Sequence, residues 1–565
     1  MKRRLIALVA LAVAVAVVGG GIAWSKRENI LIALVQYTTN QRYADVAPNR
    51  EIPWQQGPAA PVVAVAERPP NIILIVADDL GYNDISTFGG GVGGMQTPSI
   101  DRLAAEGAVF TQSYSGASTC APSRAMMMTG RYPTRTGFEF TPTPPGMIKL
   151  VSAVSKSMDS MDSGLPPALY DQALEESQPP YGRKGLPASE VTIAETLKAQ
   201  GYYTAHIGKW HLGRENGMAP HEQGFRDSLL MQSGMYLPEN DPNVVNAKVS
   251  FDPIDKFLWA GMRFSATYNA GEADKFKPGG YLTDYWTDES IKVIKANKNR
   301  PFFLYLAHWG PHTPLQATRE DFDALEGIEP HRKRVYAGMI RAVDRSVGRI
   351  LDTLEQEGIA DNTLVVFTSD NGGAGYIGIP EVNSPFRGFK ITMFEGGLRV
   401  PLFVKWPAKI APGISVNEPV AHIDVMPTLA AAAGASQPEG VVIDGVDLLP
   451  LATGEGADDW HRDTLFWQNG HYQVVRHGDW KLQVNDRPTD GLQKWLYNLA
   501  DDPTEQINLA ASRSDKLNEL SALLAAHQAS ARGPLYESIS QMPVMIDKTL
   551  AEKFVEGDEY VYTPN

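Results

Sequence analysis

Three runs of almost uninterrupted apolar residues most constrain the fold of this chain. They span residues 71–77, 301–307 and 363–369. Such runs are typical of strands that are buried on both faces, as in a parallel sheet. Segments with a helical pattern, including 284–296 and 332–357, lie between them. This alternation predicts an α/β fold with a mostly parallel central sheet covered by helices on both faces.

Polar residues recur where these runs end. Those that follow the three runs and a further predicted strand at 202–207 are Asp78, Asp79, Lys209, His211, His312, Asp370 and Asn371. Open α/β sheets place their active sites at the carboxyl ends of strands, so we expect these side chains to share one site. Asp78 and Asp79 repel each other unless a cation is present. Lys209 and His211 alternate on an extended segment, which predicts that both side chains point the same way.

The pattern divides the chain into a catalytic domain at 71–458 and a C-terminal subdomain and tail at 459–565. Short strands and a helix at 515–528 indicate that the second unit is α+β with an antiparallel sheet. Residues 139–186 are rich in Pro, Ser and Met, and predict a long insertion that either rims the cleft or is a disordered loop. Residues 29–70 are Pro-rich and predict a linker.

The N-terminus carries the pattern of an export segment. Lys2, Arg3 and Arg4 precede an apolar stretch that runs from Leu5 to Trp24. Residues 1–28 are therefore predicted to be a signal peptide or an N-terminal membrane anchor, with the rest of the chain outside the cytoplasm. The predicted location is periplasmic or extracellular, with the anchor as the favoured form because no clear cleavage site of small residues is present.

Composition narrows the class of protein. The chain has 43% hydrophobic and 21% charged residues, as a large globular enzyme does. Its formal charge of −14 argues against a nucleic-acid partner, although the local field of a pocket can still favour an anionic substrate. The chain contains one cysteine, Cys120, so it forms no intramolecular disulfide. Pro122 suits the first position of a helix, which predicts that Cys120 lies just before a helix N-terminus.

The stretch Cys120-Ala-Pro-Ser-Arg124 resembles the signature of the sulfatase family, and further motifs follow in that family's order between about residues 70 and 530. The matching residues are Asp78, Asp79, Cys120, Arg124, Lys209, His211, His312, Asp370, Asn371, Lys390 and Glu395. Two positions depart from the pattern or add to it, Asn83 and His308, and neither receives a family role. The resemblance implies an alkaline-phosphatase-like fold and hydrolysis of sulfate esters.

The resemblance also implies a set of cofactors. Cys120 would be oxidised to formylglycine by a formylglycine-generating enzyme, and the hydrate of this aldehyde would be the nucleophile. One divalent cation would bind at the nucleophile of residue 120 and at Asp78, Asp79, Asp370 and Asn371. Three carboxylates and an amide oxygen suit Ca²⁺ most, and Mg²⁺ second, and they suit Zn²⁺ poorly.

Individual roles follow from the same resemblance. Arg124, Lys209 and Lys390 would bind the hydrate and the charge that spreads over the sulfate. His211 would deprotonate the second hydroxyl of the hydrate and so expel sulfate. His312 would protonate the departing alcohol oxygen. The substrate would be an aryl sulfate or a sulfated carbohydrate.

Other functions remain open at this point. The first alternative is a phosphonate monoester or phosphodiester hydrolase that uses the same formylglycine chemistry. A glycan-binding homologue without catalysis is a second, although every motif residue is present. Two-metal phosphohydrolases fit less well, because Asn371 stands where they have a metal-binding histidine.

Overall fold

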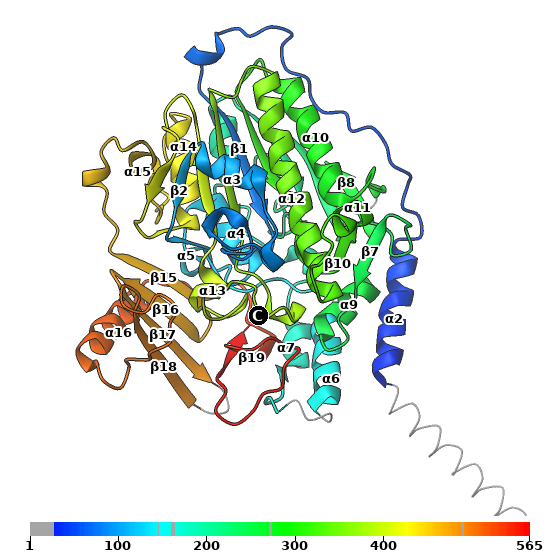
Figure 1. Cartoon of the computed structure of the whole chain (residues 1–565), viewed down its shortest axis with the longest axis vertical. Helices are drawn as coiled ribbons and strands as arrows, with labels where there is room; N and C mark the ends of the chain where they lie inside the picture. The colour runs from blue at the N-terminus through cyan, green and yellow to red at the C-terminus, as the bar shows by residue number, and fades with distance from the viewer. Residues whose placement is uncertain (1–26, 145, 160–163, 270–273, 488–490, 565) are drawn as a thin grey trace, which may run out of the picture.

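The computed structural model describes residues 27–144, 146–159, 164–269, 274–487 and 491–564 (Figure 1). Within these residues the largest sheet has nine strands. In spatial order they are β13 (Ile414–Val416), β2 (Ala108–Phe110), β12 (Leu402–Lys405), β11 (Thr363–Ser369), β1 (Asn71–Ala77), β9 (Phe302–Ala307), β5 (Tyr203–Gly208), β6 (Asp227–Gly234) and β8 (Phe264–Tyr268). The central strands β11, β1, β9, β5 and β6 are parallel, and β12 and β8 are antiparallel to their neighbours. The predicted α/β class and mostly parallel sheet are confirmed.

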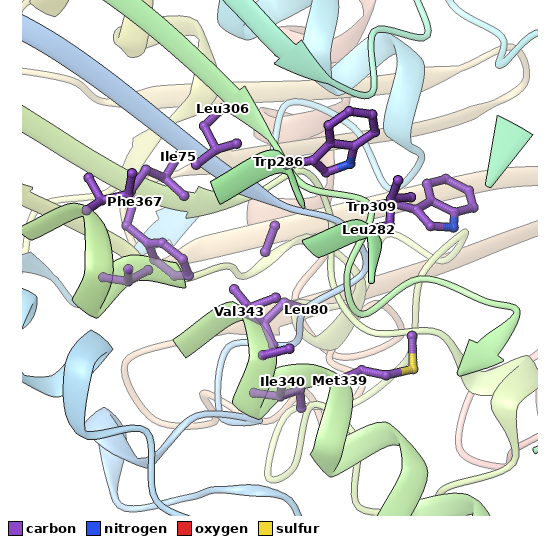
Figure 2. Packing of buried hydrophobic residues seen from close by; sticks show 14 of the residues in the cluster. Ile75, Leu80, Leu282, Trp286, Leu306, Trp309, Met339, Ile340, Val343 and Phe367 are labelled. Atoms are coloured by element: carbon purple, nitrogen blue, oxygen red, sulfur yellow. The ribbon is translucent and has the colours of Figure 1, made fainter. Parts of the chain in front are cut away.

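Helices cover both faces of this sheet. On one face Ile73 and Ile75 of β1 belong to a buried cluster with α3 (Pro98–Ala105), α10 (Leu282–Asn297) and α12 (His331–Gln356). Figure 2 shows Ile75 beside Leu306 and Phe367 of the neighbouring strands, with side chains of α10 and α12 in the same cluster. On the other face Ile72 and Leu74 pack with α4 (Cys120–Thr129), α8 (Ile193–Ala199) and α14 (Val425–Ala432). Since successive side chains of a strand point to opposite faces, the apolar run of β1 serves both layers.

A separate antiparallel sheet follows in the chain. It consists of β15 (Thr464–Asn469), β16 (Tyr472–His477), β17 (Trp480–Arg487) and β18 (Gly491–Asn498). Leu520 and Leu524 of α16 (Ser514–Ala529) pack against Val475 and Leu482 of this sheet. The predicted antiparallel sheet with its helix is confirmed, whereas the boundary at 458/459 stays a prediction.

Further short elements lie between or beside those named above. They are β3 (Ser113–Tyr114), α5 (Pro133–Thr136), β7 (Val244–Ala247), α9 (Pro253–Gly261), β10 (Leu315–Thr318), α11 (Arg319–Asp323), α13 (Glu395–Leu398), β14 (Val420–Ala421) and α15 (Leu449–Thr453). The pairs β7–β10 and β3–β14 form two small ladders beside the main sheet.

Two segments contain more structure than the sequence predicted. The expected linker at 29–70 begins with a helix, α2 (Arg27–Arg42), which contacts α9 and α6. The expected insertion at 139–186 contains α6 (Met147–Asp159), β4 (Leu169–Tyr170) and α7 (Gln172–Ser177). Strand β4 pairs with β19 (Ser540–Met545), which pairs with β20 (Tyr560–Pro564) near the C-terminus. Local composition missed these elements because packing on distant segments stabilises them.

The predicted export segment at 1–28 falls almost wholly on residues 1–26, which lie outside the described residues. Among the residues that are described, no helix is both long and apolar enough to cross a membrane.

Candidate active site

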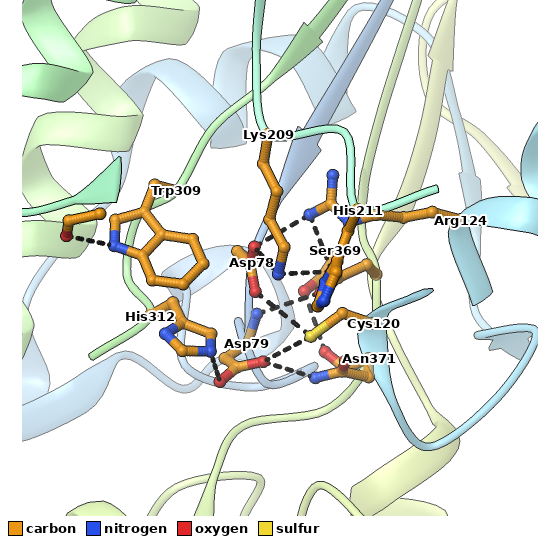
Figure 3. A network of polar contacts seen from close by, with 12 residues as sticks. Asp78, Asp79, Cys120, Arg124, Lys209, His211, Trp309, His312, Ser369 and Asn371 are labelled. Atoms are coloured by element: carbon orange, nitrogen blue, oxygen red, sulfur yellow. Dashed lines mark hydrogen bonds and ion pairs between the residues drawn. The ribbon is translucent and has the colours of Figure 1, made fainter. Parts of the chain in front are cut away.

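Four neighbouring parallel strands bring the predicted polar residues to one edge of the sheet. Strands β1 and β11 run in register, with Ala77 opposite Ser369, so the residues that follow them, Asp78 and Asp370, are neighbours. The segments after β5 and β9 reach the same edge because both strands are parallel to β1. Figure 3 shows the resulting cluster around Cys120.

Cys120 is the first residue of α4, and Thr119 precedes the helix in an extended conformation. The helix therefore begins two residues earlier than Pro122, and the expectation that Cys120 precedes the helix is wrong by a short margin. Proline is tolerated in the first turn because its missing N–H has no intrahelical partner there. Arg124 lies one turn further along and is fully buried. The helix thus presents both residues of the signature to the edge of the sheet.

Two buried cationic side chains lie within ion-pair distance of Asp78. Nη2 of Arg124 and Nζ of Lys209 lie 3.0 and 2.6 Å from Asp78 Oδ2. The same guanidinium lies 2.7 Å from Asp370 Oδ2, and its Nε donates to that oxygen at 2.8 Å. Nη1 of Arg124 donates to the hydroxyl of Tyr305 at 3.2 Å. Arg124 therefore bridges the ends of β1 and β11 through hydrogen bonds to both carboxylates.

A second group forms around Asp79. Nζ of Lys390 lies 2.7 Å from Asp79 Oδ1 and donates to Cys120 Sγ at 3.1 Å. His312 Nε2 lies 3.6 Å from Asp79 Oδ2, and the hydroxyl of Tyr376 donates to the same oxygen at 2.9 Å. The Cys120 thiol lies 3.7 and 3.9 Å from one oxygen of Asp78 and one of Asp79. Cys120 is thus placed between two carboxylates and an ammonium group.

The carboxylates do not ionise equally easily. Burial, and then the charge of Asp370, raise the pKa of Asp78 to about 7. Burial also disfavours the ionised form of Asp370, but the charges of Arg124 and Lys209 keep the pKa of Asp370 below the ordinary value. In the same way Lys390 and His312 overcome burial and lower the pKa of Asp79. Crowded acids of this kind favour a bound cation, which removes the repulsion between them.

The donor set fits a hard divalent cation. One atom each from Asp78, Asp79, Cys120 and His312 lie within 4.8 Å of one another. Asn371 is fully buried, and its Oδ1 has no hydrogen-bond partner among the described residues, while its Nδ2 donates to Asp79 Oδ1 at 2.8 Å. A buried amide oxygen without a partner is costly unless a ligand satisfies it. Carboxylate and amide oxygens are the ligands that Ca²⁺ and Mg²⁺ prefer.

His211 lies beyond the end of β5 in a left-handed conformation with φ of 64°. The predicted extended alternation with Lys209 is therefore wrong, although both side chains still reach the site (Figure 3). Burial, and then the charge of Lys209, hold the pKa of His211 well below its usual value, so the ring is neutral. Its Nε2 donates to the Pro142 carbonyl at 3.3 Å, and its Nδ1 has no partner among the described residues. The ring can therefore accept a proton at Nδ1.

His312 is held by two contacts. Its ring stacks on Trp309 with centroids 3.9 Å apart, and its Nδ1 donates to the Thr313 carbonyl at 2.6 Å. Burial lowers the pKa of His312 to about 3, against the opposing charge of Asp79. The neutral ring with a proton on Nδ1 leaves Nε2 unprotonated. His312 can act as an acid only after an anionic ligand has raised its pKa enough for Nε2 to gain a proton.

The structure also reveals neighbours that sequence reasoning missed. Tyr376 contacts Asp79, Trp309 supports His312 and lies 4.8 Å from the Lys209 ammonium, and Tyr305 holds Arg124. Trp309 and Tyr376 follow strand ends closely in sequence, and this position could have indicated them. Tyr305 lies inside the apolar run of β9, where nothing distinguishes it from a core residue.

Three residues singled out in the sequence lie away from this cluster. Glu395 is buried against Lys481, with Glu395 Oε1 and Lys481 Nζ 2.9 Å apart. His308 shares a hydrogen bond of 2.9 Å with Ser346 Oγ on α12. Asn83 donates to the Ser384 carbonyl at 2.9 Å. Each of these contacts holds its side chain away from the cluster around Cys120.

The cluster opens into a cleft of about 440 Å³. Its apolar lining includes Val35 of α2, Met147 of α6, and Phe257 and Leu258 of α9. Pro142 lies in the 139–186 segment and lines the cleft too, as do several neighbours in that segment. The segment therefore rims the cleft, which is the first of the two alternatives that its composition left open.

Comparison with known proteins identifies the family. A family model described as Sulfatase matches residues 70–435, and one described as N-sulphoglucosamine sulphohydrolase, C-terminal, matches residues 388–530. Steryl-sulfatase of Mus musculus is 33% identical over 482 residues, which cover 74% of this chain and 70% of that protein. N-acetylgalactosamine-6-sulfatase of Mus musculus is 33% identical over 433 residues, which cover 75% and 73%.

Solved structures agree as well. The structure of Ps i-CgsB in complex with k-i-k-neocarrahexaose superimposes with a TM-score of 0.66 at 30% identity, covering 83% of this chain and 95% of that chain. The phosphonate monoester hydrolase of Agrobacterium radiobacter has a TM-score of 0.54 at 20% identity, which is a likeness of fold alone. On the extent of the family match and the identity to curated sulfatases, the chain belongs to the sulfatase family and is a sulfuric ester hydrolase.

Proposed function

We propose that this chain hydrolyses an aryl sulfate or a sulfated carbohydrate to the alcohol and inorganic sulfate, with a formylglycine made from Cys120 and one divalent cation. The observation that carries the proposal is the convergence of three buried cations, Arg124, Lys209 and Lys390, on the carboxylates around Cys120. These three cations balance the charges of the three carboxylates, so a bound divalent cation would leave the site positive. A positive site suits an anionic sulfate group, whose charge spreads over its oxygens in the transition state.

The unmodified cysteine is a poor nucleophile in this site. Burial, and then the charge of Asp370, raise the pKa of the Cys120 thiol to about 12, so the thiol stays protonated at neutral pH. Formylglycine supplies an aldehyde hydrate with two hydroxyls, one to attack sulfur and one whose deprotonation releases sulfate. A formylglycine-generating enzyme is therefore the partner required during maturation.

The residues that would hold the cation are Asp78, Asp79, Asp370, Asn371 and the modified residue 120. When bound, a divalent cation supplies positive charge for a sulfate oxygen and favours the deprotonated nucleophile. The oxygen-rich donor set favours Ca²⁺, with Mg²⁺ second. The orphaned Oδ1 of buried Asn371 supports this assignment.

The two histidines take opposite proton roles. His211 is neutral with Nδ1 free, so it removes the proton of the second hydroxyl at that atom. His312 gives a proton from Nε2 to the departing alcohol oxygen, once the bound anion has raised the pKa of the ring. Arg124, Lys209 and Lys390 bind the hydrate and the charge that spreads over the sulfate group.

Location and domain organisation are part of the proposal. The basic residues and apolar stretch at the N-terminus support an exported protein, periplasmic or extracellular, with residues 1–28 as signal peptide or membrane anchor. The catalytic domain would span 71–458, and residues 459–565 would form the C-terminal subdomain and tail.

The test compares one aryl group as its sulfate and as its phosphonate. Protein is made with and without a formylglycine-generating enzyme, and mass spectrometry measures the converted fraction of the Cys120 peptide. Release of sulfate from nitrophenyl sulfate should rise with the converted fraction and be lost in Cys120→Ala. Full activity with unmodified thiol would overturn the mechanism. Faster cleavage of the phosphonate would favour the alternative hydrolase, and no turnover of either ester would favour the glycan-binding alternative.

A further inference from the structure

A side chamber of about 110 Å³ opens beside the reacting residues. It shares Ile254, Tyr376, Lys390 and Ile391 with the main cleft, so the two spaces adjoin at these residues. Lys390 also donates to Cys120 Sγ, so one side chain of the chamber wall contacts the nucleophile position.

The chamber wall is apolar. Segments far apart in the sequence meet there: the 139–186 insertion, the start of α9, the loop around Lys390, and the strand β19 with the residues after it (Figure 1). The apolar residues that line it are Leu165, Pro166, Ala168, Pro253, Phe389, Met542, Pro543, Val544, Met545 and Leu550, besides Ile254 and Ile391.

The polar side chains of the wall already have partners. Asp252 accepts hydrogen bonds from the backbone N–H groups of Ile254 and Asp255, both at 2.9 Å. Nζ of Lys548 lies 2.6 Å from Asp558 Oδ2. Tyr376 donates to Asp79. Sugar hydroxyls entering this chamber would lose hydrogen bonds to water and find few replacements, which costs free energy for each group.

The chamber adjoins residues that lie near His312, the proposed acid for the leaving group. Tyr376 at its entrance and His312, the proposed acid, both contact Asp79 Oδ2. An alcohol oxygen placed to receive the proton of His312 is therefore close to the entrance, and the carbon skeleton attached to that oxygen can extend into the chamber.

Part of the wall lies near this chain's C-terminus. Residues 540–550 lie outside 70–435 and 388–530, the two stretches that the family models match. Strand β19 is held against the insertion by its pairing with β4. This pairing brings the C-terminal part of the wall next to the part that the insertion supplies.

We propose that the side chamber binds an apolar group carried by the alcohol of the sulfate ester, which makes this chain selective for apolar aryl sulfates over sulfated sugars. The inference rests on the proposed sulfatase function and selects between the two substrate classes named there. A cavity of about 150 Å³ lined by apolar side chains can hold benzene, so this smaller chamber fits a short or branched alkyl substituent.

The experiment uses phenyl sulfates with alkyl groups of one to four carbons at position 3 or 4, assayed on the full, converted enzyme. Alkyl groups change the phenol as a leaving group very little, so kcat/KM reports their binding. The rise should approach about fourfold for each methylene that becomes buried, in at least one of the two series. N-acetylgalactosamine 6-sulfate should be turned over more slowly than the butyl compounds.

Variants separate the chamber from the rest of the site. Met542→Glu should flatten the dependence on alkyl length, because it replaces an apolar side chain of the wall with a carboxylate that has no hydrogen-bond partner provided for it. Met542→Leu, of similar volume, should keep it. Val555→Glu is the matched control, since Val555 is 52% exposed on the same C-terminal segment and does not line the chamber. Thermal unfolding of each variant verifies that the chain is folded.

The outcomes distinguish the two proposals. Sulfate release that is independent of alkyl length in both series, or that is fastest for the sugar sulfate, overturns the chamber assignment and leaves the sulfatase function intact. No sulfate release from any ester by converted enzyme overturns the proposed function itself.

Discussion

At the scale of single residues, the pair Asp78 and Asp370 determines how the site depends on pH. Asp78 has a pKa raised to about 7, compared with 3.8 for an ordinary aspartate, because it is buried beside Asp370. A carboxyl whose pKa is raised by folding stabilises the fold fully below the ordinary value, and that contribution is lost as pH rises through the folded value.

In metal-free protein, the free energy of unfolding should therefore include a term that falls between about pH 4 and pH 7, by at most about 1.4 kcal/mol per pH unit. Asp78→Asn should remove this term, because the amide that replaces the carboxyl group does not titrate in this pH range. The measurement is urea unfolding in chelator at pH 4.5 and 7. Buried acids far from the site are common to both proteins and cancel, so the difference reports Asp78 together with its neighbours Asp79 and Asp370. Identical slopes would contradict the prediction.

The same site gives a metal prediction. Asp78→Ala and Asp370→Ala should abolish turnover, since each removes a proposed cation ligand. Ca²⁺ should raise the midpoint of thermal unfolding of the wild type more at pH 7.5 than at pH 5, because ionised carboxylates bind it. Full activity in protein shown to contain no metal would rule out the role assigned to these residues.

The two histidines should respond differently to the leaving group. A sugar alcohol needs a proton as its bond to sulfur breaks, whereas nitrophenolate leaves readily, and general acid help is worth roughly 100-fold to 10,000-fold. His312→Ala should be severe on a sulfated sugar and milder on nitrophenyl sulfate. His211→Ala should impair both alike. Single-turnover and steady-state rates are compared because product release can hide chemistry. Equal losses in the His312 variant would remove its assignment as the acid.

At the scale of elements, Asn383 connects three active-site loops through hydrogen bonds. Asn383 is buried with φ of 69°, and its Oδ1 accepts from the Gly373 N–H at 2.7 Å. Its Nδ2 donates to the carbonyls of Gly373 and Gly388 at 2.9 and 3.3 Å. Its own N–H donates to Asp84 at 3.1 Å, and Asp84 in turn accepts from the Gly81 N–H. The loops that carry Asp79, Asn371 and Lys390 therefore share one hydrogen-bond network.

Asn383→Ala should weaken Ca²⁺ binding by about 10-fold to 100-fold, because residues that orient metal ligands have effects of that size. Higher Ca²⁺ should restore part of the activity, which a simply unfolded variant would not show. Calorimetric titration measures the affinity. Asn216→Ala is the control, since Asn216 also has a positive φ, of 58°, but is exposed. Equal Ca²⁺ affinity in the Asn383 variant and the control would contradict the role of Asn383 in orienting the metal ligands.

At the scale of the whole molecule, a buried ionic network joins the catalytic part to the antiparallel sheet. Lys481 of β17 lies 2.9 Å from Glu395 and 3.0 Å from Glu505, and all three side chains are fully buried. Glu505 also accepts the backbone N–H of Glu395 at 2.6 Å. Burial acts against the charge of Glu395, but Lys481 and Arg399 lower its pKa to about 2.

Lys481→Met should destabilise the protein by about 3 to 5 kcal/mol, because it leaves two buried carboxylates without their shared cation. Urea unfolding measures this loss. Lys494→Met on the neighbouring strand β18 is the control, since Lys494 is only partly buried and should change the free energy of unfolding by less than about 1 kcal/mol. A loss in the Lys481 variant no larger than in the control would show that the network does not stabilise this interface.

The class of the sheet and the edge that carries the site could be predicted from local sequence patterns. The apolar runs at 71–77 and 363–369 became β1 and β11, because strands buried on both faces require continuous apolar residues. Since parallel strands end at a common edge, the residues after them had to meet there, as Asp78 and Asp370 do. The motifs around Cys120 and Lys390 could indicate the family because each is a short continuous stretch of sequence.

The distant segments that complete the site could not be predicted in this way, because they are brought together by the packing of the whole chain. The tertiary structure packs α2 against α6 and α9, pairs β4 with β19 to form the chamber wall, and directs Glu395 to Lys481 instead of the cleft. No local pattern specifies such contacts, because they depend on complementary shape and charge between residues that are far apart in the sequence. Periodicity reports which face of an element is buried, whereas the partner that buries it is selected only when the whole chain packs.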